Sequence, residues 1–131
     1  MKVLAALLLF AVSIACLHAQ CPDPGSLKDA AGTKVCARMF EDSHYYYEQS
    51  CGGDYLDTYA GDDYPFMPKN WNNRISSLVV SRSCSLTVWE RSRKEGNRRK
   101  FTSGIQYRLK DVGQGLFSDW DNDISAYYCE C

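Results

Sequence analysis

The chain has 131 residues, and its 15 Lys and Arg nearly balance its 16 Asp and Glu, for a formal net charge of −1. This balance excludes a general nucleic-acid binder, which needs a cationic surface to neutralise phosphates.

Residues 1–19 are predicted to be a secretion signal. A basic residue precedes the apolar run 3–12, and small residues follow it, which is the order of a cleaved signal peptide. The run is too short for a permanent membrane anchor. Cleavage after Ala19 leaves a chain that begins at Gln20 and is long enough for one domain. Cleavage after Ala15, which would expose Cys16 as in a bacterial lipoprotein, is the alternative.

The cysteines of the mature chain predict a disulfide framework. An even number of cysteines behind a signal peptide indicates disulfides rather than a zinc site. Cys36 and Cys51 flank the first expected hairpin and could face each other, whereas the remaining cysteines allow three arrangements. The six residues are Cys21, Cys36, Cys51, Cys84, Cys129 and Cys131.

Charge is unevenly distributed along the chain. Residues 39–68 and 111–131 contain acids and no Lys or Arg, whereas 69–110 is strongly basic. This segregation predicts one cationic patch. Six of its residues form what we call the basic hairpin: Arg91, Arg93, Lys94, Arg98, Arg99 and Lys100. Such a group gains about 1 kcal/mol per charge at an anionic lipid surface. A sulfated glycan, a bacterial envelope lipid, an acidic protein face, or water alone are the alternatives.

An internal repeat organises the mature chain. Residues 71–77 match 120–126 at an offset of 49, and the same offset pairs Phe40 with Trp89. Residues 83–90 alternate as a half-buried strand does, and no segment shows a sustained helical stripe. We therefore expect an all-β fold, in which two Greek-key motifs form a disulfide-stapled β-sandwich. The expected layout is an N-terminal extension over 20–33 and one domain over 34–131, with repeats near 34–82 and 83–131.

Each repeat resembles the βγ-crystallin Greek key. Trp89, Glu90 and Gly96 match its aromatic residue, acid and glycine, and Ser125 matches its later serine. The glycine matters because the folded hairpin needs a left-handed residue. In the first repeat Tyr47 stands where the glycine is expected.

This resemblance also implies a calcium clamp with two half-sites, residues 72–77 and 121–126. Calcium takes about six to eight hard oxygens. Serine hydroxyls and backbone carbonyls would supply some, and a glutamate would complete the opposite half-site. The alternative is that Asn and Asp only shape the turns. The implied residues are Glu41, Asn72, Asn73, Arg74, Ser76, Glu90, Asp121, Asn122, Asp123 and Ser125.

The whole mature chain resembles the syncollin family of zymogen-granule proteins. Segments 51–53, 68–71, 86–89 and 124–126 are among those that carry the resemblance. It implies a protein of the secretory-granule lumen that associates with the lumenal face of the membrane. It also implies dependence on cholesterol or other lipid, self-association, a role in fusion and exocytosis, and membrane permeabilisation. A granule-membrane protein is a further implied partner.

A second contact candidate is the tyrosine tip, Tyr45, Tyr46 and Tyr47, because tyrosine suits a membrane interface. The alternative is that alternate tyrosines pack into the domain. No nucleophile–base set, phosphate-binding glycine loop or histidine pair stands out, so we expect no enzyme.

We therefore expect a secreted granule protein that binds membrane peripherally and regulates fusion or exocytosis. The alternatives are a host-defence protein that binds microbial envelope lipid or glycan, and a passive packing protein of the granule matrix.

Overall fold

The computed structural model describes residues 20–43 and 50–131. The predicted signal peptide and the tyrosine tip lie outside these residues. Within the described part of the chain, no helix is long and apolar enough to cross a bilayer. The elements are the strands β1 (Ala37–Ser43), β2 (Cys51–Thr58), β3 (Asp63–Tyr64), β4 (Ser77–Arg91), β5 (Glu95–Gln106), β6 (Gly113–Gln114), β7 (Ser118–Asp119) and β8 (Ala126–Glu130), and the short 3-10 turns η1 (Pro24–Ser26), η2 (Ser92–Lys94) and η3 (Leu109–Asp111).

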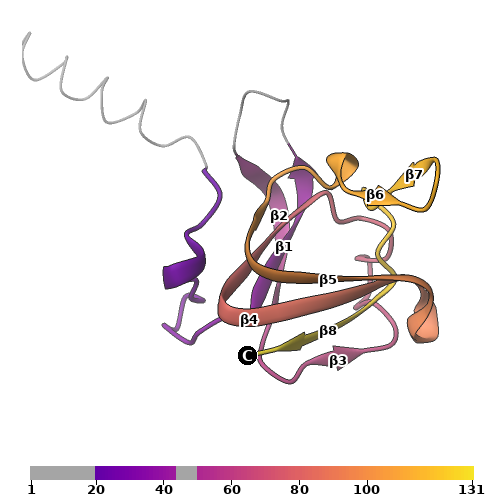
Figure 1. Ribbon diagram of the computed structural model, residues 1–131. Helices are drawn as coiled ribbons and strands as arrows, with labels where there is room; N and C mark the ends of the chain where they lie inside the picture. The colour runs from indigo at the N-terminus through magenta and orange to yellow at the C-terminus, as the bar shows by residue number, and fades with distance from the viewer. Residues whose placement is uncertain (1–19, 44–49) are drawn as a thin grey trace, which may run out of the picture.

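The long strand β4 joins the two repeats. Its first residues pair with β1, and residues 85–89 pair with β8. Between these parts Ser83 has a φ of 65°, and the pairing with β5 shifts register. The expected strand 83–90 is therefore the second part of one longer, bent strand. In Figure 1 the β1–β2 pair stands upright while β4, β5 and β8 run across it.

The main core lies between these two groups of strands. Leu86 and Val88, which the alternation places on one face, are both fully buried, together with Met39, Trp120 and Tyr127. Full burial of an aliphatic or aromatic side chain stabilises the fold by roughly 1.5–3 kcal/mol. The predicted period-2 pattern of this strand is confirmed.

The N-terminal extension covers a second, smaller core. Leu27 packs with Phe40 and Val79 on the face of β1 and β4 that points away from the main core. The Ser81 hydroxyl donates to the Pro24 carbonyl at 3.2 Å, which ties η1 to the bend of β4.

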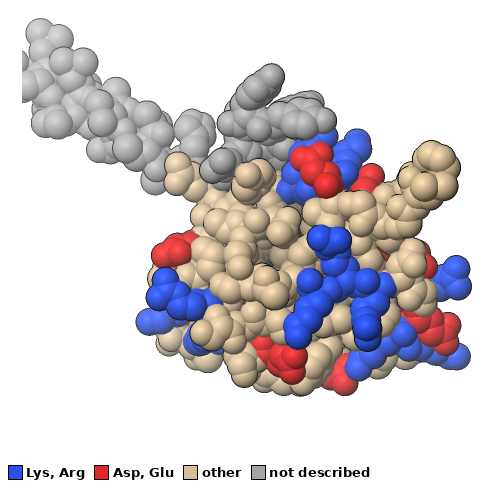
Figure 2. All heavy atoms as spheres, viewed as in Figure 1, with Lys and Arg blue, Asp and Glu red and all other residues tan. Residues whose placement is uncertain are grey.

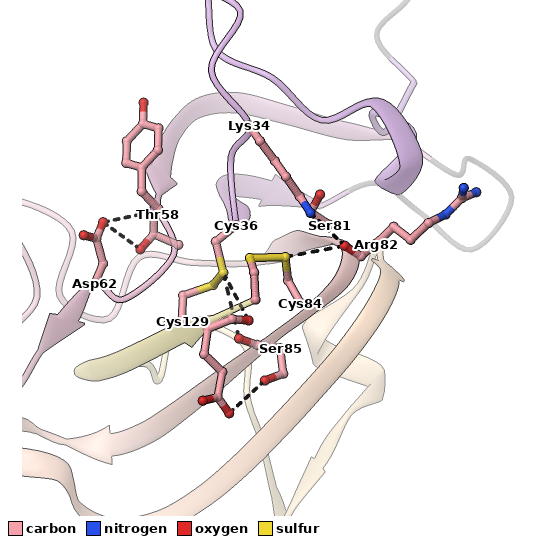
Figure 3. The surroundings of a disulfide bond; sticks show 12 residues. Lys34, Cys36, Thr58, Asp62, Ser81, Arg82, Cys84, Ser85 and Cys129 are labelled. Atoms are coloured by element: carbon pink, nitrogen blue, oxygen red, sulfur yellow. Dashed lines mark hydrogen bonds between the residues drawn. A yellow bond between two sulfur atoms is a disulfide. The ribbon is translucent and has the colours of Figure 1, made fainter.

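Three disulfides close the fold, as expected: Cys21–Cys51, Cys36–Cys129 and Cys84–Cys131. The suggested pairing of Cys36 with Cys51 is wrong. In the β1–β2 hairpin Cys51 lies opposite Ser43, whereas the Cys36 N–H donates to Thr58 at the other end. The sulfurs of Cys36, Cys84 and Cys131 lie within 4.8 Å of one another, so two bridges are neighbours (Figure 3).

Candidate functional site

The basic hairpin lies at the end of β4, in η2 and at the start of β5. All of its residues except the half-buried Lys94 are exposed. Figure 2 shows Lys and Arg side chains gathered over β5. Among the described strands, β5 pairs with β4 alone, so one edge of β5 is left without a described strand beside the charges.

Glu90 and Gly96 shape this hairpin. Gly96 has a φ of 77°, and the Asn97 N–H donates to Glu90 Oε1 at 2.9 Å. A Cβ added at Gly96 would lie 2.4 Å from the same oxygen. The turn therefore needs a residue that is left-handed and lacks a side chain.

The first repeat has the same glutamate–glycine contact, but with a different spacing between the two residues in the sequence. Gly53 has a φ of 75°, and the Asp54 N–H donates to Glu41 Oε1 at 2.9 Å. A Cβ at Gly53 would lie 2.4 Å from Glu41 Cγ. The glycine that the pattern places at position 47, which lies outside the described residues, is therefore found at Gly53, because the first hairpin is longer and places its glycine further along the chain.

We predict that Gly96→Ala lowers the free energy of unfolding by about 3 kcal/mol. A left-handed non-glycine residue costs roughly 1–2 kcal/mol, and the contact with Glu90 adds to this. Gly32→Ala is the matched control, because Gly32 has a φ of 84° with no atom within 4 Å of an added Cβ, and it should cost only the roughly 1–2 kcal/mol of the left-handed backbone. Urea unfolding measures both, and equal losses would contradict the steric role.

Several charges of the basic hairpin have partners. Lys94 forms an ion pair with Asp63 and lies over the Trp89 ring at 5.5 Å. Lys100 lies 3.8 Å from Glu130. Within the described residues, Arg99 forms no ion pair but lies over the Phe101 ring at 5.6 Å, whereas Arg93 and Arg98 have neither an ion pair nor a ring contact. These two guanidiniums are therefore the charges most open to an external anion.

The two half-sites of the implied calcium clamp meet crosswise. The Ser76 hydroxyl donates to Asn122 Oδ1, and the Ser125 hydroxyl donates to Asn73 Oδ1, each at 3.1 Å. Asn73 and Asn122 have φ values of 56° and 54°, so both also shape left-handed turns. The structure thus brings these four predicted residues together, but their side-chain oxygens already take part in hydrogen bonds with each other.

Arg74 occupies the first half-site with a cation of the protein itself. Its guanidinium donates to Glu41, lies 3.5 Å from Asp54 Oδ2 and covers the Trp71 ring at 4.8 Å. Glu41 therefore contacts the half-site of its own repeat. A second cation would be repelled by Arg74, so the first half-site does not fit calcium.

The second half-site is partly engaged as well. Asp123 Oδ2 accepts from Gln114 Nε2 at 2.7 Å, whereas the buried Asp121 Oδ1 has no hydrogen-bond partner among the described residues. In the same residues, the one group of three potential metal-binding side chains is Cys36, Cys84 and Cys131, which are all in disulfides. Calcium binding stays a prediction.

The Glu41–Arg74 contact predicts a pH dependence of stability. The pKa of Glu41 lies below its usual value, first because the Asp54 N–H donates to it and then because Arg74 does. The stability from this carboxylate is present above its unfolded pKa and is lost as the pH falls through the lower folded pKa. We expect Arg74→Met to flatten this acid-induced loss without abolishing it, since the Asp54 contact remains.

Urea midpoints from about pH 6 down to about pH 3 measure this change. Lys69→Met is the matched control, because it removes one exposed positive charge elsewhere. An acid profile altered equally by both substitutions would contradict a specific Glu41–Arg74 contact.

The structure also presents two side chains that the sequence patterns do not single out. Leu116 and Phe117, between β6 and β7, are 85% and 95% exposed. Their one sequence signal is an apolar pair between Gly115 and Ser118 in a glycine-rich loop. Because an apolar pair in a loop can equally well pack against the core, the sequence does not identify these two side chains as exposed.

Known proteins resemble this chain in sequence and in fold. A family model described as Syncollin matches residues 20–131. Human syncollin is 44% identical over 119 residues, covering 91% of this chain and 89% of the relative. Rat syncollin is 44% identical over 111 residues, covering 85% and 83%.

The solved structures that resemble it are βγ-crystallin domains. An archaeal βγ-crystallin has a TM-score of 0.54 at 22% identity, covering 70% of this chain and 93% of its own. A Ciona intestinalis βγ-crystallin has a TM-score of 0.53 at 20% identity, covering 70% and 94%. A clostrillin double mutant in complex with nickel has a TM-score of 0.56 at 18% identity, covering 76% and 100%. The predicted βγ-crystallin-like fold is confirmed.

Proposed function

Because this chain belongs to the syncollin family, we propose that it acts by binding, as a lumenal protein of secretory granules. In this role it associates peripherally with the granule membrane and regulates fusion or exocytosis. Anionic lipid, cholesterol, a granule-membrane protein and further copies of the chain are its proposed partners. Three disulfides suit this location, because such bonds persist in oxidising compartments such as the secretory lumen.

The exposed basic hairpin carries the proposal. Its open charges, Arg93 and Arg98, stand on a turn whose backbone is held by the Glu90–Asn97 hydrogen bond of 2.9 Å. A rigid cationic surface gains Coulomb energy at an anionic bilayer without first having to be ordered. Ion pairs such as Lys100–Glu130 are exposed and therefore weak, so they leave part of the field available to lipid headgroups.

Vesicle flotation of the disulfide-bonded mature protein tests the proposal. We expect flotation with anionic vesicles, a decrease at high salt, and much weaker flotation with neutral vesicles. Arms with cholesterol, and with calcium or a chelator, determine whether either contributes. Absence of flotation under every condition would overturn direct membrane binding.

The same assay separates the two rivals. Selective binding to bacterial lipopolysaccharide or lipoteichoic acid over granule-like anionic lipid would favour host defence. Lipid-free aggregation triggered by acid, with no vesicle binding, would favour passive packing in the granule matrix.

A further inference from the structure

The most exposed apolar side chains of the described residues lie together at one hairpin tip. Leu116 is 85% exposed and Phe117 is 95% exposed, whereas the other large exposed apolar residues reach 55% at most. In Figure 2 the tip of the β6–β7 hairpin forms a tan lobe that projects from the upper right of the molecule. At these exposures, the described residues shield neither side chain from water.

The buried side-chain amide of Gln114 holds the base of this hairpin. Gln114 is 3% exposed, and its Nε2 donates to the Asp119 carbonyl at 3.1 Å and to Asp123 Oδ2 at 2.7 Å. The Ser118 hydroxyl donates to the Gln114 carbonyl, and Gly115 supplies a left-handed φ of 64°. The fold therefore presents the apolar pair in a set position, which removes the entropy cost of ordering a loop on binding.

The apolar tip adjoins the basic hairpin. Asn97 Nδ2 donates to Gln114 Oε1 at 3.2 Å, and Arg98 follows Asn97 directly at the start of β5. Lys110, in η3 ahead of β6, is also exposed. An apolar pair beside cations combines the two forces that hold a peripheral protein at an anionic membrane.

A second copy of the chain fits this tip less well than a bilayer does. A stable protein interface buries about 800 Å² on each partner, which two side chains on a narrow hairpin cannot supply. A bilayer needs no complementary groove, because each apolar side chain that reaches the acyl boundary contributes by itself.

We propose that Leu116 and Phe117 insert at the boundary between headgroups and acyl chains, while the basic hairpin contacts anionic headgroups. This inference rests on the proposed membrane function and names the part of the protein that enters the lipid. Lipid contact through the tip adds an apolar component to binding, one that salt does not screen.

The test compares vesicle partitioning of the mature protein with that of Leu116→Ser/Phe117→Ser. We expect an about 100-fold loss of partition coefficient on anionic vesicles, about tenfold for each side chain. The residual binding should become more sensitive to salt. The unfolding midpoint should not change, because both side chains are exposed. Tyr55→Ser, which removes a 53% exposed aromatic ring on β2, is the matched control and should partition like the parent.

A conservative variant provides a second readout. Phe117→Trp should retain binding, and lipids brominated in the acyl chain should quench its additional emission. Equal partitioning of the parent and the double variant would overturn the tip insertion alone. A parent that does not bind anionic vesicles would overturn the proposed membrane function as well. Loss of self-association in the double variant, with vesicle binding unchanged, would assign the tip to a second copy instead.

Discussion

Removal of the Cys36–Cys129 bridge, by changing both residues to Ala, is expected to lower the free energy of unfolding by about 4 kcal/mol. The Cys36–Cys129 cross-link spans 93 residues of sequence. Because the Cys84–Cys131 bridge offers a shorter path, the loop that Cys36–Cys129 closes is roughly half as long. Both sulfurs lie in the main core, where Cys36 is 1% and Cys129 is 0% exposed. Loss of the bridge therefore frees the unfolded chain and leaves a packing defect.

Such a loss approaches the whole stability of a small domain, about 5–15 kcal/mol. Urea unfolding without reductant measures it. The matched variant Cys21→Ala/Cys51→Ala should lose less, because that bridge spans 30 residues and ties the N-terminal extension rather than the two repeats. A loss below about 1 kcal/mol for the central bridge, or the reverse ranking, would contradict this account of the fold.

The second large effect concerns membrane binding. Arg93→Gln/Arg98→Gln is expected to weaken binding to anionic vesicles about 30-fold at low salt, since each charge contributes about 1 kcal/mol near the surface. The variant spares Lys94, which contacts Asp63, Trp89 and Tyr128 and supports the fold.

The control changes net charge by the same amount at residues outside the basic hairpin. Lys28→Gln/Lys69→Gln removes two exposed cations and should weaken vesicle binding only a few-fold, through the average field of the protein. Equal effects of the two variants would show that binding depends on overall charge and would remove the basic hairpin as the contact surface.

Local patterns were sufficient to predict the fold. The repeat at offset 49 and the set Trp89, Glu90 and Gly96 indicate the Greek keys, because each residue is required by geometry within one hairpin. The first glycine was missed for a related reason. Gly53 pairs with Glu41 in space, but the longer loop between β1 and β2 changes their spacing, and a fixed-spacing pattern cannot detect this.

The proposed contact surface was only half predictable from the sequence. A cluster of cations is visible in sequence because charges in a hairpin stay near water wherever the hairpin lies. The hairpin that exposes Leu116 and Phe117 is held instead by Gln114, whose hydrogen bonds reach Asn97 and Asp123, 17 and 9 residues away, outside the loop itself. The Arg74–Glu41 contact is likewise a tertiary feature, and it places a cation of the protein itself in the half-site where the pattern predicts a bound ion.

Hydrogen–deuterium exchange of the mature protein with and without anionic vesicles tests the membrane-contact surface most directly. We expect amides at the open edge of β5 and in the β6–β7 hairpin to exchange with water in the free protein, and lipid contact should shield them. We predict slower exchange at residues 91–100 and 113–119, with β1 and β2 unchanged. Vesicle binding that slows exchange only elsewhere, or leaves every segment unchanged, would contradict binding through this surface.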